Sequence, residues 1–392
     1  MEELLALEDA IELVLERARP LEAERVELAS ALGRVLAEPA RAQTDLPPFA
    51  SSAMDGFAVR SADTPASLPV AARIAAGHPA ERPLEPGEAM AIATGGVVPD
   101  GADAVIPIEE VVERDGAVEV GRVNSGANLR PRGGDVRAGG EVLPAATRLT
   151  PAQIGALAAA GVATVACTRR ARAAVLATGT ELRRPGEELH AGEIYESNGA
   201  LLAASLADAG AELDMIETVA DDEEAHTRAL EQALSADVVI SSGGVSVGPH
   251  DLVRRVAAQL GVEEVFWRVA VKPGKPVSFG VRGTTLLFGL PGNPVSTLVG
   301  FEVFVRPALR KLAGEREPGP RWREGRLARS VRRNATRDEL LRARTTPDGL
   351  EPLRGQESHM IVRAAAADAL VFVPRGEGEL ASGATVSWLP LA

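Results

Sequence analysis

The feature that most constrains the fold is a regular alternation of short apolar runs with amphipathic helical patterns, which begins near Arg172. Strands that alternate with helices along a chain form a mostly parallel sheet with helices on both faces. We therefore expect a doubly wound α/β domain over residues 171–314. The expected strands are AAVLATG, AELDMIETV, DVVISS, EVFWRVAV and TTLLFGL, and the expected helices are GALLAASLADAG, DDEEAHTRALEQALSA, HDLVRRVAAQLG and Pro294–Ala313.

Two further parts of the chain have patterns typical of β structure. Residues 43–143 carry short apolar runs such as AMAIATG and DAVIPIEEVV, separated by Gly and Pro. This pattern predicts a β-rich domain. Residues 315–392 return to short strands and turns, which predict a small C-terminal β domain.

The β-rich domain is flanked by helical patterns. Glu2–Arg19 and Ser30–Ala37 precede it, with a short strand candidate, RVEL, between them, and Pro151–Ala160 follows it. We expect these helices to meet, so that residues 1–42 and 144–170 form a discontinuous helical linker module into which the β-rich domain is inserted.

Composition excludes several classes of function. A chain of 392 residues is too long for one ordinary core, and a net charge of -13 disfavours non-specific binding to nucleic acid, which needs a basic face. The single cysteine, Cys167, cannot form an internal disulfide, and with five scattered histidines no Cys/His zinc spacing occurs. A metal ion would have to be held by oxygen ligands.

The sequence also argues against membrane insertion or export. The N-terminus carries acids among its leucines and lacks the basic start, apolar run and cleavage site of a signal peptide. The uncharged run Leu149–Thr168 is interrupted by Pro151, Gly155 and Gly161, so we expect a buried helix, a stop at Gly161 and a short strand. We expect a cytoplasmic protein.

Three loops of the α/β domain follow strands and carry unusual residues. In the first loop, ATGTEL, Glu181 follows a Gly turn. The second loop, SSGGVSVG, is followed by Asp251 in the expected first turn of a helix. The third loop, LPGNP, provides an N-cap residue and a proline for the start of a helix. Ligands bind beyond the carboxyl ends of strands in such sheets, so the loops together predict a ligand site. Neither a P-loop nor a dinucleotide motif is present. The candidate substrate-binding residues are Thr178, Gly179, Ser242, Gly243, Gly244, Ser246, Gly248, Pro291, Gly292 and Asn293.

A basic segment, WRVAVKPGKP, adds cations to this edge. Lys272 and Lys275 bracket a Pro-Gly pair, and in an extended segment both ammonium groups would face one anion, with Arg268 nearby. Acids together with bases suit a phosphorylated substrate with Mg²⁺, for which Glu181 and Asp251 are the candidate ligands. Solvated surface lysines are the alternative interpretation.

Two acids of the β-rich domain are further candidates. Asp55 lies in PPFASSAMDGFAVR and Asp135 in NLRPRGGDVRAGG. An Asx turn at Asp55 and a plain surface turn at Asp135 explain them about equally well from local sequence.

These residues form an ordered set of motifs. SAMDGFAVR, ATGGVVPDGADAVIPIE, NLRPRGGDV, TGTELRRPGEELHAGEIYESN, SSGGVSVGPHD, FWRVAVKPGKP and LFGLPGNPVS span roughly residues 45–300. In this order they resemble the molybdopterin molybdenumtransferases, the MoeA and gephyrin E-domain family. The resemblance implies an elongated homodimer whose subunit has four parts, including a molybdopterin-binding α/β domain and a C-terminal β-barrel.

The resemblance also implies the last step of molybdenum cofactor assembly. Adenylylated molybdopterin, supplied by a molybdopterin adenylyltransferase, and molybdate give the cofactor and AMP, with Mg²⁺ or a similar divalent ion. By matching motif, the catalytic residues are Asp55, Asp135, Glu181, Asp251, Lys272 and Lys275. The family's site lies between two subunits, so Asp55 would complete the pocket of its partner.

The sequence departs from the family pattern at two positions, Glu357 and Arg268. Ser358, in QESHM, resembles a serine that would donate to an oxyanion, but Glu357 stands where glycine is usual. Arg268 stands where lysine is common, so a planar guanidinium takes the place of a compact ammonium. Two other functions are open from the sequence: adenylylation of molybdopterin by ATP, and a scaffold that binds molybdopterin without catalysis.

Overall fold

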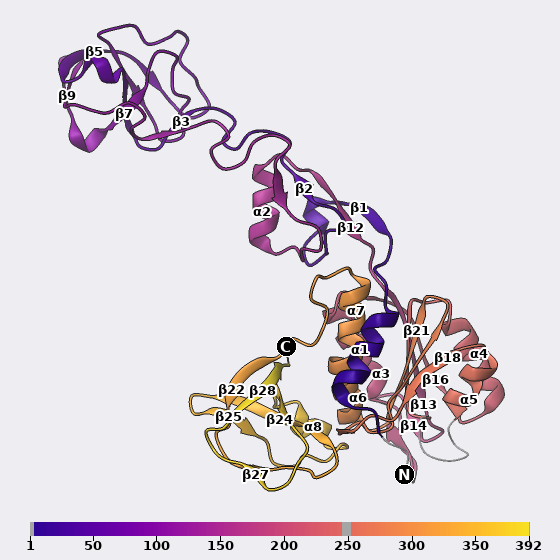
Figure 1. The fold of residues 1–392 in the computed structure, drawn as a ribbon. Coiled ribbons are helices and arrows are strands. Elements are labelled where there is room, and N and C mark those ends of the chain that lie inside the picture. The colour runs from indigo at the N-terminus through magenta and orange to yellow at the C-terminus, as the bar shows by residue number, and fades with distance from the viewer. Residues whose placement is uncertain (1–3, 245–251, 392) are drawn as a thin grey trace.

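The computed structural model describes residues 4–244 and 252–391 and shows an elongated molecule (Figure 1). One end holds the strands β3 to β9. The other end holds the α/β sheet with its helices, and the C-terminal strands lie beside it. A narrow middle part, with α2, β1, β2 and β12, connects the two ends. The β-rich end is therefore remote from the α/β sheet within one chain.

A six-stranded sheet forms the α/β part, in the order β16-β13-β17-β21-β20-β18. The first four strands are parallel, and β20 and β18 run antiparallel to their neighbours. The bounds are Arg172–Thr178 for β13, Glu212–Val219 for β16, Val238–Ser242 for β17, Glu263–Trp267 for β18, Ser278–Arg282 for β20 and Thr285–Leu290 for β21. A two-stranded pair, β14 (Leu182–Arg183) and β15 (Ile194–Tyr195), follows β13.

Helices cover both faces of this sheet, as the alternation predicts. Ala173 and Val175 of β13 belong to one core, whereas Ala174 and Leu176 belong to the core on the opposite face. The first core contains α1 (Leu7–Arg17), α3 (Asn198–Asp208), α6 (Pro294–Gly300), the π-helical turn η4 (Phe301–Val305) and α7 (Arg306–Leu312); the second contains α4 (Glu223–Ala233) and α5 (Leu252–Gln259). The expectation of one helix from Pro294 is met by α6, η4 and α7 in continuous succession.

The expected strand EVFWRVAV is wrong as a single element. Arg268 has a φ of 69° and ends β18 after Trp267. The chain then forms β19 (Val271–Lys272), which pairs with the C-terminal sheet, and returns as β20, which the alternation did not predict. A positive φ is costly for a residue with a Cβ, and no local signal in the sequence marks it.

The β-rich part is a mixed six-stranded sheet in the order β7-β4-β6-β5-β9-β8, packed around two small cores. A short pair, β3 with β10, leads into it. The bounds are Ser51–Ser52 for β3, Gly56–Val59 for β4, Ala66–Ile74 for β5, Ala89–Ile92 for β6, Ala104–Pro107 for β7, Val112–Arg114 for β8, Ala117–Val120 for β9 and Leu129–Arg130 for β10, with 3-10 turns η2 (Ser61–Asp63) and η3 (Ile108–Glu110).

The middle part differs from the expected helical module. The predicted helix Ser30–Ala37 is wrong: a 3-10 turn, η1 (Leu28–Ser30), is followed by Gly33 at φ 75° and by extended residues that bridge to Arg148 and Cys167. Gly33 ends the turn because glycine adopts a positive φ readily. The other elements are β1 (Ala23–Glu27) paired with β12 (Thr164–Thr168), β2 (Ala40–Arg41) paired with β11 (Glu141–Leu143), and α2 (Pro151–Ala159).

Two helices also pack differently from the expectation. The helix α1 contributes to the core beneath the α/β sheet, so it does not pack with α2. The uncharged run from Leu149 does form α2, a stop at Gly161 and β12, but only Leu157 of α2 is buried. Within the described residues no helix is long and apolar enough to cross a membrane.

The C-terminal part is a sheet in the order β19-β24-β26-β28-β22, with β25 paired to β24. Its strand pairs are antiparallel except for β19 with β24, which is parallel. Leu327, next to β22, bridges to Leu350 of β25, so the two ends of the sheet approach each other. The bounds are Arg323–Arg326 for β22, Val331–Arg332 for β23, Asp338–Thr346 for β24, Gly349–Pro352 for β25, Ile361–Ala364 for α8, Ala369–Val373 for β26, Glu379–Leu380 for β27 and Thr385–Pro390 for β28.

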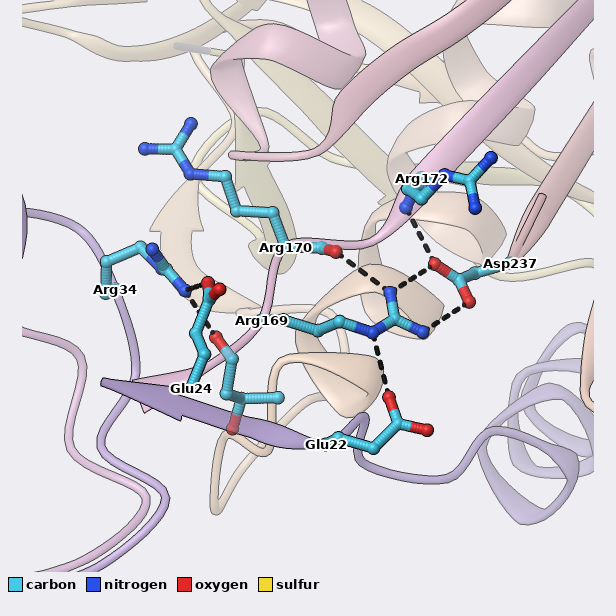
Figure 2. A network of polar contacts seen from close by, with 8 residues as sticks. Glu22, Glu24, Arg34, Arg169, Arg170, Arg172 and Asp237 are labelled. Carbon is cyan, nitrogen blue, oxygen red and sulfur yellow. Dashed lines mark hydrogen bonds and ion pairs between the residues drawn. The ribbon is translucent and has the colours of Figure 1, made fainter. Parts of the chain in front are cut away.

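A polar network fixes the α/β sheet to the middle part (Figure 2). Arg169 lies between Glu22 and Asp237: its Nε donates to Glu22 at 2.8 Å, and its two terminal nitrogens donate to the Asp237 carboxylate at 2.7 and 2.8 Å. The Arg172 N–H adds a third bond to Asp237 at 2.8 Å. Burial raises the pKa of Asp237, but these donors outweigh it and hold the pKa below its usual range.

A second ion pair acts at the same junction. Glu315, which follows α7 and is almost fully buried, accepts two hydrogen bonds from Arg148 at 2.8 and 2.6 Å and one from Arg321 at 2.6 Å. Arg148 also donates to the Gly33 carbonyl at 2.6 Å. The middle part, the α/β part and the segment leading to β22 therefore meet at one carboxylate.

Asp237→Asn is expected to lower the free energy of unfolding by about 1–3 kcal/mol at neutral pH, because it removes the charge that accepts these three bonds. Since the folded-state pKa of Asp237 is lowered, its stabilisation is present above the unfolded pKa and is lost as pH falls through the folded value. The difference from wild type should shrink below about pH 4 in urea titrations. The control is Glu22→Gln, whose carboxylate is 79% exposed and should matter little. Equal stability of Asp237→Asn and wild type at pH 7 would contradict the account.

Candidate active site

The carboxyl ends of three parallel strands meet at one edge of the α/β sheet. Ala177 of β13 pairs with Ser242 of β17, and Ser242 pairs with Leu290 of β21. The loops that leave these strands therefore start side by side, about 5 Å apart. They are the three loops that the sequence marks as unusual, so the expected grouping of Thr178, Ser242 and Pro291 at one edge is observed in the structure.

The glycines of the second loop allow close packing against the first. Gly243 has a φ of 93°, and a Cβ built on it would lie 2.6 Å from Thr178 Oγ1 and 2.7 Å from the Thr178 carbonyl oxygen. A Cβ on Gly244, at φ 65°, would lie 2.8 Å from Val253 Cγ2. Any side chain here would force the two loops apart, so this close packing requires glycine. Ser246, Gly248 and Asp251 lie outside the described residues.

Asn198, at the start of α3, joins the second and third loops, and the sequence reasoning missed it. Its side-chain NH2 donates to Ser242 Oγ at 2.8 Å and to the Gly292 carbonyl at 2.7 Å. Its Oδ1 is buried and has no hydrogen-bond partner among the described residues. Its position in the sequence could have identified it. Asn198 directly follows the residues YES, at the start of a helix that begins at the same edge of the sheet.

The third loop is held by Thr297 of α6. Its hydroxyl donates to the Pro291 carbonyl at 2.8 Å and lies 3.3 Å from Ser242 Oγ. Asn293 occupies the N-cap position and Pro294 the first turn, as expected, although the Asn293 side chain makes no capping hydrogen bond. Gly292 and Asn293 are both exposed at this edge.

Ser358 reaches the same place from the C-terminal part. Its carbonyl accepts a hydrogen bond at 3.0 Å from the N–H of Val295, in the first turn of α6. Glu357, which replaces the usual glycine, is exposed beside it, and its carbonyl accepts from the buried Arg342 at 3.3 Å. The C-terminal sheet thus supplies one wall next to the third loop.

Glu181 is exposed and folds back over the first loop. A Cβ on Gly179 would lie 2.6 Å from Glu181 Oε2, so the carboxylate covers the glycine. In the parts of the chain that the structure describes, no group of three or more His, Cys, Asp or Glu side chains could hold a metal ion. Glu181 is thus the one member of the expected pair of Mg²⁺ ligands whose position is described.

The basic segment flanks the edge, but its cations do not converge as expected. β20 runs antiparallel to β21, so the residues before Ser278 lie at the carboxyl edge. Lys272 Nζ forms an ion pair with Glu339 at 2.6 Å, and residues 272–277 form a turn with Gly274 at φ 108° instead of an extended segment. Lys275 is exposed, and the Arg268 guanidinium lies 3.7 Å from the centre of the Trp267 ring.

Asp55 lies between β3 and β4 of the β-rich part, and Asp135 lies between β10 and β11, on the chain that returns to the middle part. The β-rich part is remote from the α/β sheet (Figure 1). Asp55 is exposed, and its Oδ1 accepts from the Thr94 N–H at 2.8 Å, which holds the loop after β3 against the loop after β6. Asp135 is exposed, and its N–H donates to the Leu46 carbonyl at 2.9 Å. The nearby Asp45 accepts from the Ala138 N–H and from Arg132, which hold its pKa below the usual range. One chain does not bring these acids to the three loops.

Models of three family regions match the chain in succession. Residues 5–161 match the MoeA N-terminal region (domain I and II), residues 174–311 a probable molybdopterin binding domain, and residues 324–391 the MoeA C-terminal region (domain IV). Molybdopterin molybdenumtransferase 2 of Mycobacterium tuberculosis strain H37Rv is 41% identical over 325 residues, which cover 78% of this chain and 79% of the relative. The chain belongs to the molybdopterin molybdenumtransferase family.

Other relatives of this family match nearly the whole chain. The molybdopterin molybdenumtransferase of Bacillus subtilis strain 168 is 32% identical over an alignment 407 residues long, gaps included, which covers 98% of this chain and 94% of the relative. The crystal structure of a molybdopterin biosynthesis MoeA protein from Pyrococcus horikoshii has 32% sequence identity and a TM-score of 0.85, with 99% of each chain covered. The three loops lie within the part that matches the molybdopterin binding model.

Asn198→Ala is expected to loosen the two loops that its amide joins. The loss of two hydrogen bonds should lower the free energy of unfolding by about 1–2 kcal/mol. Hydrogen exchange measured by mass spectrometry should quicken in peptides that contain Ser242 and Gly292 but not in the β-rich end. Gln259→Ala is the matched control, because its exposed amide donates to Glu223 of α4 at 3.1 Å and not to either loop among the described residues. Unchanged exchange at both loops would show that Asn198 does not hold them.

Proposed function

We propose that this protein inserts molybdenum from molybdate into adenylylated molybdopterin and releases AMP, the last step of molybdenum cofactor biosynthesis. The main support is the arrangement of three glycine-containing loops at the carboxyl edge of the α/β sheet, where Asn198 and Thr297 join them. This sheet lies in the part of the chain that matches a molybdopterin binding domain. Such an edge exposes backbone to an anionic substrate. The substrate requires a preceding adenylyltransferase as its donor.

The residues at this edge would bind different parts of the substrate. Thr178, Gly179, Gly243 and Gly244, at the carboxyl ends of β13 and β17, would lie near the pyrophosphate link. Ser358 and the residues of the third loop would position the rest of the substrate. Ser246 and Gly248, outside the described residues, are proposed to continue this surface.

Charged groups around the edge would neutralise the two anions. Lys275, Lys272 and Arg268 are proposed to attract molybdate, a dianion, and to offset charge that develops as the P–O bond breaks. Lys272 is half exposed, at 47%, while paired with Glu339, so its ammonium remains accessible to a second anion. Glu181 is proposed as a Mg²⁺ ligand with Asp251, because Mg²⁺ binds through one or two carboxylates plus substrate oxygens.

We further propose a homodimer in which the β-rich end of one subunit completes the edge of the other. Asp55 belongs to the β-rich part and Asp135 to the segment between β10 and β11, and the β-rich part is remote from the α/β sheet that carries the three loops (Figure 1). The helix α2 adds support: it carries no charge, and most of its alanine-rich surface is exposed. Exposed surface of this kind is typical of an interface.

The direct test is AMP release from adenylylated molybdopterin by the purified full-length protein with Mg²⁺. We expect release that depends on molybdate. ATP consumption in the presence of molybdopterin would instead indicate adenylyltransferase activity, and binding of the substrate without molybdate-dependent release would indicate a scaffold. A family member of known activity, assayed in parallel, validates the substrate preparation.

Mixed dimers test the shared site. Asp55→Asn and Glu181→Gln should each lower AMP release by about 100-fold or more, if each carboxylate acts on the reacting groups. When the two inactive variants are mixed and re-dimerised, half of the dimers carry one intact site of two, so about a quarter of wild-type activity should return. Two variants within the same site, Thr178→Val and Glu181→Gln, are the non-complementing control. Verified mixed dimers without activity would refute the shared site.

A further inference from the structure

A cavity of about 400 Å³ lies between α5 and the strands β18, β20 and β21, on the sheet face that α4 and α5 cover. This volume is within the range of small-molecule pockets, about 300–1,000 Å³. Nothing in the proposed roles of the three loops uses it. Its lining residues are Val253, Arg254, Arg255, Ala257, Ala258, Val262, Glu264, Ser278, Phe279, Gly280 and Leu287.

The cavity exists because β20 presents small residues on this face. Phe279 and Val281 point into the core on the opposite face, so Ser278 and Gly280 point toward α5. Gly280 has no side chain, and a Cβ there would lie 2.7 Å from Val262 Cγ1. Val262 therefore packs directly on Gly280, and both residues line the cavity, which is called the slot below.

One end of the slot reaches the proposed active site. Val253, in its wall, is the residue that a Cβ on Gly244 would meet at 2.8 Å. Ser278 pairs with Gly289, one residue before the end of β21. A substrate whose phosphates lie at the loops could place a terminal ring in the slot without a long linker.

The polar groups of the slot suit a ring with both donors and acceptors. Ser278 is only 7% exposed and lines the slot. Arg254 donates to both oxygens of Glu264, at 2.5 and 2.8 Å, and lies 3.8 Å from the centre of the Trp267 ring. These contacts fix a polar group of α5 beside the apolar side chains of Val253 and Ala257 on the same helix.

We propose that this slot binds the amino-substituted planar heterocycle at one end of the substrate. Adenylylated molybdopterin carries two such rings, a purine and a pterin, with the pyrophosphate between them. The assignment rests on the proposed function for the identity of the ligand and on the cavity for its place. Ser278 would donate to a ring nitrogen or oxygen, and the walls would exclude water from the faces of the ring.

The test is isothermal titration of the full-length protein with two probes, AMP and pterin-6-carboxylate, which carry the two rings separately. Ala258→Trp fills the slot from an exposed position of α5 and should weaken binding of one probe by about tenfold or more. Ser278→Ala should weaken the same probe by about threefold or more. Ala207→Trp, an exposed alanine of α3 that belongs to the opposite face, is the matched control. Melting temperatures of all variants are compared with wild type.

The outcomes separate the subsite from the function. Selective loss of AMP binding assigns the purine to the slot, and selective loss of pterin binding assigns the pterin. The subsite is refuted if Ala258→Trp and Ala207→Trp have the same affinity for each probe, or if the wild-type protein binds neither probe. This conclusion holds even where molybdate-dependent AMP release is observed. Ring binding that responds to Ala258→Trp without such release would retain the subsite and reject the proposed function.

Discussion

The parallel hydrogen bonding of β13, β17 and β21 determines where the rest of the molecule can act. Once Ala177 lies beside Ser242 and Ser242 beside Leu290, three loops must leave the sheet at one edge. Packing on both faces fixes this register, because β13 divides its side chains between two separate cores. A shift by one residue would exchange the two faces, so the register is strongly specified.

The loops are then fixed to one another by a few polar contacts. Asn198 and Thr297 join the second loop to the third, and the close approach of Gly243 to Thr178 joins it to the first. The hydrogen bonds of Asn198 and Thr297 satisfy the Gly292 and Pro291 carbonyls at this edge. The edge is therefore preorganised, which is what catalysis by positioning and electrostatics requires.

The elongated shape separates the candidate acids of one chain. The Arg169–Asp237 network and the Glu315 ion pairs hold the middle part at the end of the α/β sheet opposite the loops, since Asp237 precedes β17. The β-rich end is thereby directed away from its own edge loops (Figure 1). A rigid arm that carries Asp55 and Asp135 away from one active site is suited to deliver them to another.

The sequence predicted what local patterns specify. Short apolar runs identified β13 and β17 because both strands are buried on two faces, and Gly-rich endings identified the loops. It could not predict contacts that depend on tertiary structure: the Lys272–Glu339 ion pair joins residues 67 apart, and Asn198 reaches Gly292 across the edge. The helical pattern of Ser30–Ala37 failed at Gly33, and EVFWRVAV failed at the positive φ of Arg268.

The most direct test is a crystal structure of the full-length protein with AMP, Mg²⁺ and molybdate. We expect the AMP phosphate to lie against the loops that contain Gly244 and Gly292, and Asp55 of a second subunit to lie at the same edge. A phosphate bound elsewhere on the α/β part, or an edge closed by no second subunit, would contradict this expectation.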